Sequence, residues 1–144
     1  MIFAKKIHLK TRSGLFHLLP VIIWTAVILL LTGIPKDSIP KTPEFLDLFQ
    51  PDKIVHLLMF SIYVYLFNRN GSKAFPEKDR NVIFWVAILS GVLYGGLTEL
   101  MQKYIFISRN CSVYDIIANT AGCLAGGAIL KIRNRKTAGQ NENS

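Results

Sequence analysis

The 144-residue sequence contains few charged residues, and few of those are acidic. Charged residues make up 18% of the chain, against about 25% in typical soluble domains, whereas hydrophobic residues make up 51%. This balance excludes an intrinsically disordered chain and argues against an ordinary cytosolic enzyme. Because 17 Lys and Arg residues outnumber 9 Asp and Glu, the net charge is +8. Such an excess fits either nucleic acid binding or a membrane protein with basic flanks, and the distribution of the charges separates the two.

The sequence also lacks several features that would point to particular chemistry. Cys111 and Cys123 are separated by a largely helical stretch that holds them beyond disulfide reach, so we expect free thiols. Two cysteines without a paired histidine cluster do not make a zinc site. The sequence contains no phosphate-binding loop, no glycine-rich dinucleotide fingerprint and no Gly-x-Ser-x-Gly elbow. We therefore assign no cofactor and no metal from the sequence.

Long apolar segments make up much of the chain. Residues 15–34 are twenty residues without a charge, and at ~1.5 Å per residue they cover the ~30 Å of a hydrocarbon core. Two further long segments lie at residues 82–98 and 113–130. Residues 54–67 form a shorter segment, whose length alone fits a buried core helix or an interfacial helix. We predict an all-α polytopic membrane protein, a bundle of four transmembrane helices.

The basic residues are distributed unequally about this bundle. The predicted membrane domain covers residues 15–130, between a basic tail at 1–14 and a basic, polar tail at 131–144. With four helices, both tails and the connection at 68–81 share one side and hold 12 basic residues, against 5 on the other side. Basic residues stay cytoplasmic, so we expect a multi-pass cytoplasmic-membrane protein with both termini inside. The distribution also supports the short second span and removes the reason to invoke nucleic acid.

Polar residues gather at the predicted outer ends of three spans. They form the candidate binding set: Asp52, Lys53, His56, Glu99, Gln102, Arg109, Asp115 and Asn119. Asp52 and His56 are four residues apart, so they share a helix face. A charge deep in a membrane helix costs roughly 2.5–3.5 kcal/mol on insertion scales, and carboxylates such as Glu99 therefore need cations. Arg109, in the short connection after the third span, is the nearest cation in sequence, and its planar fork suits a carboxylate.

Several of these residues also have a purely structural interpretation. Asp52 fits a helix cap and Lys53 an interfacial anchor, while Asp115 and Asn119 fit helix packing as well as function. The cost of burying Glu99 favours a functional role there. We treat His56 and Glu99 as the candidates for acid–base catalysis, although the sequence does not decide whether the protein is an enzyme.

Small residues predict how two of the helices pack. Gly91 and Gly95 lie on one side of the third span, and Ala118, Gly122 and Gly126 lie on one side of the fourth. Small residues let helix backbones approach closely in lipid. We predict that the third and fourth spans pack against each other through these faces.

As a set, the polar motifs resemble the VanZ-like family of small bacterial membrane proteins. The resembling elements are Asp52-Lys53-x-x-His56, Glu99-x-x-Gln102, Arg109 and Ser112-x-x-Asp115-x-x-x-Asn119-x-x-Gly122. Members of the family commonly have Gly before the loop Arg, where this chain has Ser108. The resemblance implies a protein of the bacterial cytoplasmic membrane, in a family named for a member that gives low-level resistance to the glycopeptide teicoplanin. Glycopeptides act on cell-wall precursors outside the membrane, on the side where we place the polar cluster.

Three functions fit these observations. In the first, an accessory or binding protein uses its outer polar cluster to engage a lipid headgroup, a lipid-linked wall precursor or the antibiotic. In the second, a membrane enzyme acts on a lipid-linked headgroup, with Glu99 or His56 as acid/base and Arg109 as anion binder. A carboxylate–His–carboxylate set can also hold a divalent metal, but its spacing here is not diagnostic. The third is a structural subunit or small transporter, which requires a homo-oligomer because four helices are few for a transport path.

Overall fold

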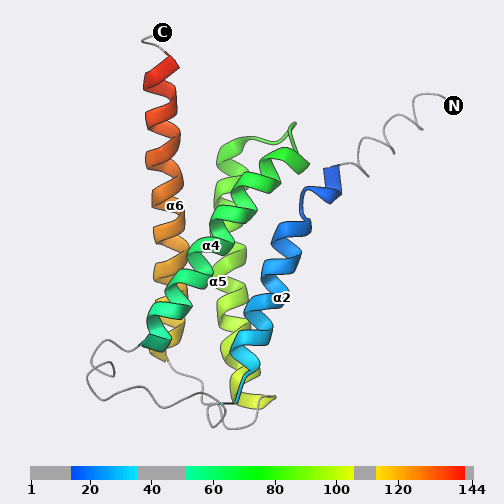
Figure 1. Cartoon of the computed structure of the whole chain (residues 1–144), viewed down its shortest axis with the longest axis vertical. Helices are drawn as coiled ribbons and strands as arrows, with labels where there is room; N and C mark the ends of the chain where they lie inside the picture. The colour runs from blue at the N-terminus through cyan, green and yellow to red at the C-terminus, as the bar shows by residue number, and fades with distance from the viewer. Residues whose placement is uncertain (1–13, 36–50, 106–112, 142–144) are drawn as a thin grey trace, which may run out of the picture.

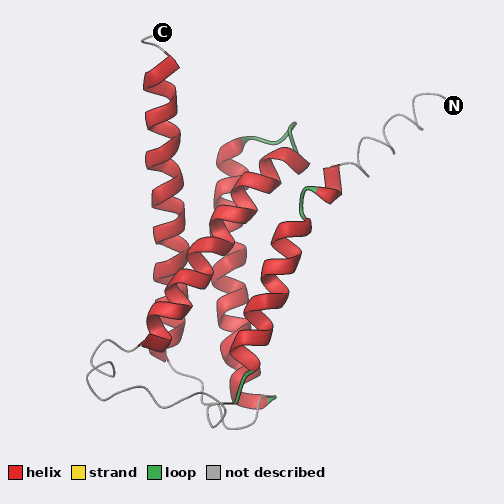
Figure 2. Cartoon of the chain, in the orientation of Figure 1, coloured by secondary structure: helices red, strands yellow, loops and turns green. Residues whose placement is uncertain are grey.

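The described part of the chain is helical almost throughout. A computed structural model describes residues 14–35, 51–105 and 113–141. Within these ranges the helices are α2 (Leu19–Gly33), α4 (Pro51–Ala74), α5 (Arg80–Tyr104) and α6 (Val113–Asn141) (Figure 1). Figure 2 shows no strand between or beside them in the described ranges. The prediction of an all-α protein is confirmed.

Three of the helical segments are long and apolar enough to cross a membrane. They are Gly14–Gly33, Arg80–Tyr104 and Val113–Asn134. Their large aliphatic and aromatic side chains are largely exposed along the bundle surface, as at Ile22, Leu30 and Leu93. Such exposure is unfavourable in water and favourable in hydrocarbon. The chain is therefore a helical-bundle membrane protein, as its apolar segments predict.

The shortest predicted span, residues 54–67, is part of a long central helix. α4 has 24 residues, or ~36 Å at ~1.5 Å per residue, and extends well beyond the predicted segment 54–67. It packs against α2, α5 and α6, so much of its surface faces protein. Its exposed residues include Ile54, Leu58 and Ile62, whereas its buried residues include His56. Charged and polar residues near its two ends, such as Lys53, Arg69 and Lys73, lower its average hydrophobicity, so α4 is not among these three segments.

The helices alternate in direction and bring four helix ends together. α2 and α5 end, and α4 and α6 begin, at the same end of the bundle (Figure 1). The turn between α4 and α5 lies at the opposite end, and α6 extends past it. The polar motifs at the start of α4, the end of α5 and the start of α6 consequently share one end of the bundle.

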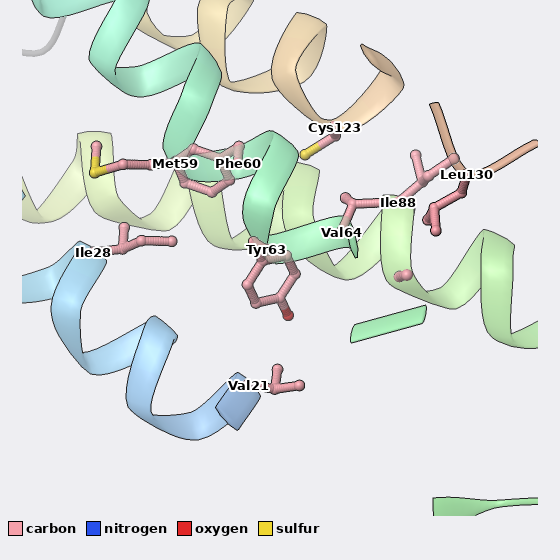
Figure 3. Packing of buried hydrophobic residues seen from close by; sticks show 10 residues of the cluster. Val21, Ile28, Met59, Phe60, Tyr63, Val64, Ile88, Cys123 and Leu130 are labelled. Carbon is pink, nitrogen blue, oxygen red and sulfur yellow. The ribbon is translucent and has the colours of Figure 1, made fainter. Parts of the chain in front are cut away.

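A hydrophobic cluster fills the middle of the bundle (Figure 3). Phe60 of α4 is fully buried, and its ring lies 6.0 Å from that of Tyr94 on α5. The polar ends of two aromatic side chains find backbone partners on other helices. The Tyr94 hydroxyl donates to the Thr25 carbonyl at 2.8 Å, and the Trp24 indole donates to the Met59 carbonyl at 3.0 Å. These bonds attach α2 to its neighbours and give both aromatic donors a partner.

The cysteine prediction is tested at one position. Cys123 is a free, buried thiol that lies in the hydrophobic cluster. Cys111 lies outside the described residues.

The small residues pack in a way that the sequence predicts only in part. Gly91 and Gly95 of α5 do face α6, because a Cβ at Gly95 would lie 2.9 Å from the Cβ of Asn119. Gly122 and Gly126 of α6, however, face α4. A Cβ at Gly122 would overlap the Leu57 carbonyl oxygen, and one at Gly126 would lie 2.6 Å from the carbonyl oxygen of Ser61. The prediction that these two glycines meet the third span is therefore wrong, because α4 lies closer to this face of α6.

We expect Gly122→Ala and Gly126→Ala to destabilise the bundle, because each added methyl group meets backbone that has little room to move. The expected cost is ~1–3 kcal/mol, which lowers the Tm by several degrees. Thermal unfolding of the purified protein in detergent, followed by intrinsic fluorescence, measures the effect. Gly96→Ala is the matched control, since a Cβ at Gly96 meets nothing within 4 Å and Ala favours a helix by up to ~1 kcal/mol. Equal Tm changes in all three variants would contradict the packing described here.

Candidate functional site

The predicted polar residues meet at the end of the bundle where α4 and α6 begin and α5 ends. Four of them are buried together and come from three helices: His56, Glu99, Asp115 and Asn119. Lys53 and Asp52 lie beside them at the start of α4, nearer the surface. Gln102 is buried at the same end but faces another neighbour, and Arg109 lies outside the described residues. The convergence predicted from topology is thus found for most of the set.

His56 is held by an amide from α6. Its Nδ1 lies 2.9 Å from Oδ1 of Asn119, and the Asn119 amide nitrogen donates to the Gly95 carbonyl at 3.4 Å. With its nitrogen directed at a carbonyl, the amide presents its oxygen to the imidazole, so Nδ1 carries the proton and donates it. A neutral His56 then has its lone pair on Nε2. The three-residue chain fixes both the ring orientation and the tautomer.

Glu99 is buried beside this imidazole. Its side chain is 0% exposed, and Oε1 lies 3.8 Å from Nδ1 of His56. That distance is too long for a hydrogen bond but short enough for strong electrostatic coupling if the ring is protonated. A carboxylate out of contact with water is costly unless charge and hydrogen bonds compensate it. The pair therefore places an imidazole and a carboxylate close enough for their charges to interact.

Lys53 lies between one exposed and one largely buried carboxylate. Its Nζ lies 3.7 Å from Oδ2 of Asp52 and 3.7 Å from Oδ1 of Asp115. Asp52 and Asp115 occupy the first turns of α4 and α6, where the positive end of the helix dipole favours an anion. The sequence offers Arg109, Lys53 and His56 as cations for the carboxylates, and among the described residues Lys53 contacts Asp115.

Tyr114 lies at the same end of the bundle, although it is not among the residues predicted from the sequence. The Lys53 Nζ lies 5.9 Å from the centroid of its ring, in cation–π range. Tyr114 is exposed and directly precedes Asp115. The sequence does hold one indication of Tyr114, because it is an aromatic residue at the predicted interfacial end of an apolar helix.

Gln102 has a structural role that spacing does not reveal. It is buried, and its Nε2 donates to the carbonyl of Thr32 at 2.9 Å. Thr32 is in the last turn of α2, where carbonyls have no partner within the helix. Gln102 thus supplies the missing donor from α5 and attaches the end of α2, and it stands apart from the His56 cluster.

Three of the buried groups also satisfy the spacing of a metal-binding set. One ligand atom from each of His56, Glu99 and Asp115 lies within 4.8 Å of the others. Such a set can bind a cation, transfer protons or bind a polar ligand, depending on what enters it.

The fold and the buried polar cluster together define a polytopic membrane protein with a site between its helices. Within that class, the model of the VanZ/LLP1 family matches residues 7–134, and the chain belongs to this family. The family suggested by the polar motifs is thereby confirmed. Neither a curated protein nor a solved structure matches the chain.

We expect Gln102→Met to lower the stability of the bundle, since the buried Thr32 carbonyl loses its donor. An unsatisfied buried acceptor costs ~1–3 kcal/mol, and the Tm in detergent reports the loss. Thr25→Val is the matched control. The Thr25 hydroxyl bonds a carbonyl of its own helix, that of Val21, so removing it leaves the contacts between helices intact. A Tm for Gln102→Met equal to that of the wild type would show that α2 does not depend on this bond.

Proposed function

We propose that this VanZ/LLP1 protein lies in the bacterial cytoplasmic membrane with the Lys53 end of the bundle outward. There its polar cluster binds the polar part of a cell-envelope molecule, a lipid headgroup, a lipid-linked wall precursor or a glycopeptide. Through that binding it modulates susceptibility to teicoplanin-type glycopeptides. The observation that carries the proposal is the complete burial of Glu99 beside His56 at one end of a membrane bundle. Ionisable groups inside a membrane domain are expensive and usually functional.

The charge distribution over the described residues supports this orientation. At the end opposite to the cluster lie Arg69, Lys73, Lys78, Arg80, Lys131 and Arg133. Lys53 and Lys103 are the described basic residues near the cluster. Since Lys and Arg favour the cytoplasmic side, the cluster is expected to face outward.

The exposure of the cluster supports binding rather than packing alone. Side-chain exposure falls from 50% at Asp52 to 27% at Lys53. It falls further, to 11% at Asp115. A polar headgroup at the membrane surface would reach Asp52 and Lys53 before the buried groups, and the Lys53 ammonium lies 3.7 Å from each of two carboxylates. An anionic group can replace either carboxylate as the partner of that ammonium, whereas a purely structural pair has no need of an exposed edge.

We expect Glu99→Gln, Asp115→Asn and Arg109→Ala each to abolish the glycopeptide phenotype while the protein stays in the membrane. The first two changes keep size and remove charge, and the third removes the anion-binding fork that we expect in the connection before α6. The measurement is the glycopeptide tolerance of a sensitive host that expresses each variant, with membrane content determined by immunoblot.

Glu77→Gln is the matched control, because Glu77 lies in the turn at the opposite end of the bundle.

The orientation is tested separately. A fluorescent-protein fusion at the C-terminus should fluoresce, since such fusions fold in the cytoplasm. Full tolerance in all three site variants would refute the proposed role of the cluster, and a dark fusion in intact membranes would refute the orientation.

A membrane enzyme acting on a lipid-linked headgroup is the second candidate, favoured by the geometry at His56. Asn119 leaves Nε2 as the basic nitrogen of the neutral ring, and Glu99 lies 3.8 Å from the opposite ring nitrogen. A positioned imidazole beside a buried carboxylate can take and return a proton. In this alternative Glu99 and His56 are the acid–base pair, and Arg109 binds the anionic group.

The enzyme alternative predicts turnover by the purified protein in detergent. Lipid-linked wall precursors and common phospholipids are incubated with it, and products are followed by mass spectrometry. His56→Gln should reduce the rate by ~10²–10⁴-fold, the usual contribution of a general acid or base, while His17→Gln should leave it unchanged. An absence of product across the panel, with the glycopeptide phenotype intact, would favour the binding role.

A further inference from the structure

The strongest unassigned feature is the composition of the buried cluster itself. His56, Glu99 and Asp115 come from α4, α5 and α6, and their ligand atoms lie within 4.8 Å of one another. Bonds of ~2.0–2.2 Å from one ion to nitrogen and oxygen place such atoms roughly 3–4 Å apart. The three atoms are therefore near the spacing that one ion requires, and the side chains must move to reach it. Burying two carboxylates and an imidazole between membrane helices is costlier than burying apolar side chains of similar size.

Asp115 provides a second, independent observation. Its Oδ1 is shielded from solvent and accepts no hydrogen bond. The ammonium of Lys53 lies 3.7 Å from this atom, which is beyond hydrogen-bonding distance. Buried carboxylate oxygens normally receive donors. A cation coordinated by Oδ1 would satisfy this oxygen directly.

The ligand set itself attracts a dication. Two carboxylates, Glu99 and Asp115, lie in it beside the imidazole of His56. A divalent ion is bound favourably by anionic oxygen ligands of this kind. It would also release Lys53 from Asp115, because the ammonium and the ion compete for the same oxygen.

Asn119 completes the arrangement expected around a metal-binding histidine. Such histidines usually donate their other ring N–H to an oxygen, which fixes the tautomer and orients the ring. The Nδ1–H of His56 donates to Oδ1 of Asn119, which leaves Nε2 as the lone-pair nitrogen. Binding of the ion through Nε2 requires the Glu99 carboxylate to move from the Nδ1 side of the ring, where its Oε1 lies 3.8 Å from Nδ1.

We propose that His56, Glu99 and Asp115 bind a divalent first-row transition metal ion, with Asn119 as the residue that orients the histidine. One imidazole and two carboxylates suit Zn²⁺ or Mn²⁺. Three protein ligands leave coordination positions open for an anionic oxygen from outside. The inference concerns metal binding alone, and it stands whether or not the protein affects glycopeptide susceptibility.

The test measures metal in the full-length protein, purified without a histidine tag in detergent and stripped with chelator. The protein is dialysed against Zn²⁺ or Mn²⁺, and bound metal is counted by inductively coupled plasma mass spectrometry, with affinity from competition against a chromophoric chelator. We expect about one ion per chain. His56→Gln, Glu99→Gln and Asp115→Asn should remove it, and Asn119→Ala should weaken it about 10- to 100-fold.

Two further variants separate ligation from general damage. The double control His17→Gln/Glu77→Gln removes an imidazole and a carboxylate away from the site and should bind as the wild type does. Lys53→Met should bind the ion more tightly, because the competing ammonium is gone, and a loss of folding cannot produce that gain. If the ligand variants aggregate, the wild type is loaded with Co²⁺ instead. Visible d–d absorption bands that disappear when Zn²⁺ is added would then support the site.

The inference is overturned if the wild type binds no metal above background or shows no Co²⁺ bands. It is equally overturned if soluble ligand variants retain the ion. These results are independent of the glycopeptide assay, so a metal-free protein that still protects the host would reject the metal site and keep the proposed function.

Discussion

The close approach of α4 and α6 sets the geometry of everything at the polar end of the bundle. The two helices begin at the same end, and Gly122 and Gly126 let the α6 backbone reach the carbonyls of Leu57 and Ser61. The Ser61 hydroxyl also donates to the Gly122 carbonyl at 2.8 Å. One turn toward the helix starts, the same register places His56 against Asn119, and a further turn places Lys53 against Asp115. Side chains at these positions meet only because the backbones are this close.

Once that register is set, α5 supplies the third side of the cluster. Gly95 lets α5 approach Asn119, and its carbonyl receives the Asn119 amide. One turn further along α5, Glu99 reaches the imidazole of His56. Each polar contact is therefore a consequence of a glycine contact nearby. The family's polar motif and the chain's small residues are two aspects of one packing arrangement.

Much of this arrangement could be predicted from the sequence, because apolar segments and basic residues fix the number and direction of the helices. That knowledge suffices to place His56, Glu99 and Asp115 at one end. It does not identify neighbours, since the spacing of Gly122 and Gly126 defines a helix face and says nothing about which helix covers it. Nor could it find the partner of Gln102, because a backbone carbonyl at Thr32 has no residue-type signature. The centrality of α4 was likewise hidden, because charged and polar residues near its ends shorten its apolar segment.

The unequal polarity of α2 and α4 has a consequence for how the chain enters the membrane during synthesis. α2 is apolar, and three side-chain hydrogen bonds to backbone carbonyls attach it to α4 and α5, those of Trp24, Tyr94 and Gln102. It can leave the translocon for lipid alone. α4 carries Lys53 and His56, whose partners Asp115 and Asn119 lie about sixty residues later in the chain. The contacts of Lys53 with Asp115 and of His56 with Asn119 can form only once α6 has been made, which makes the last helix the one that completes the polar cluster.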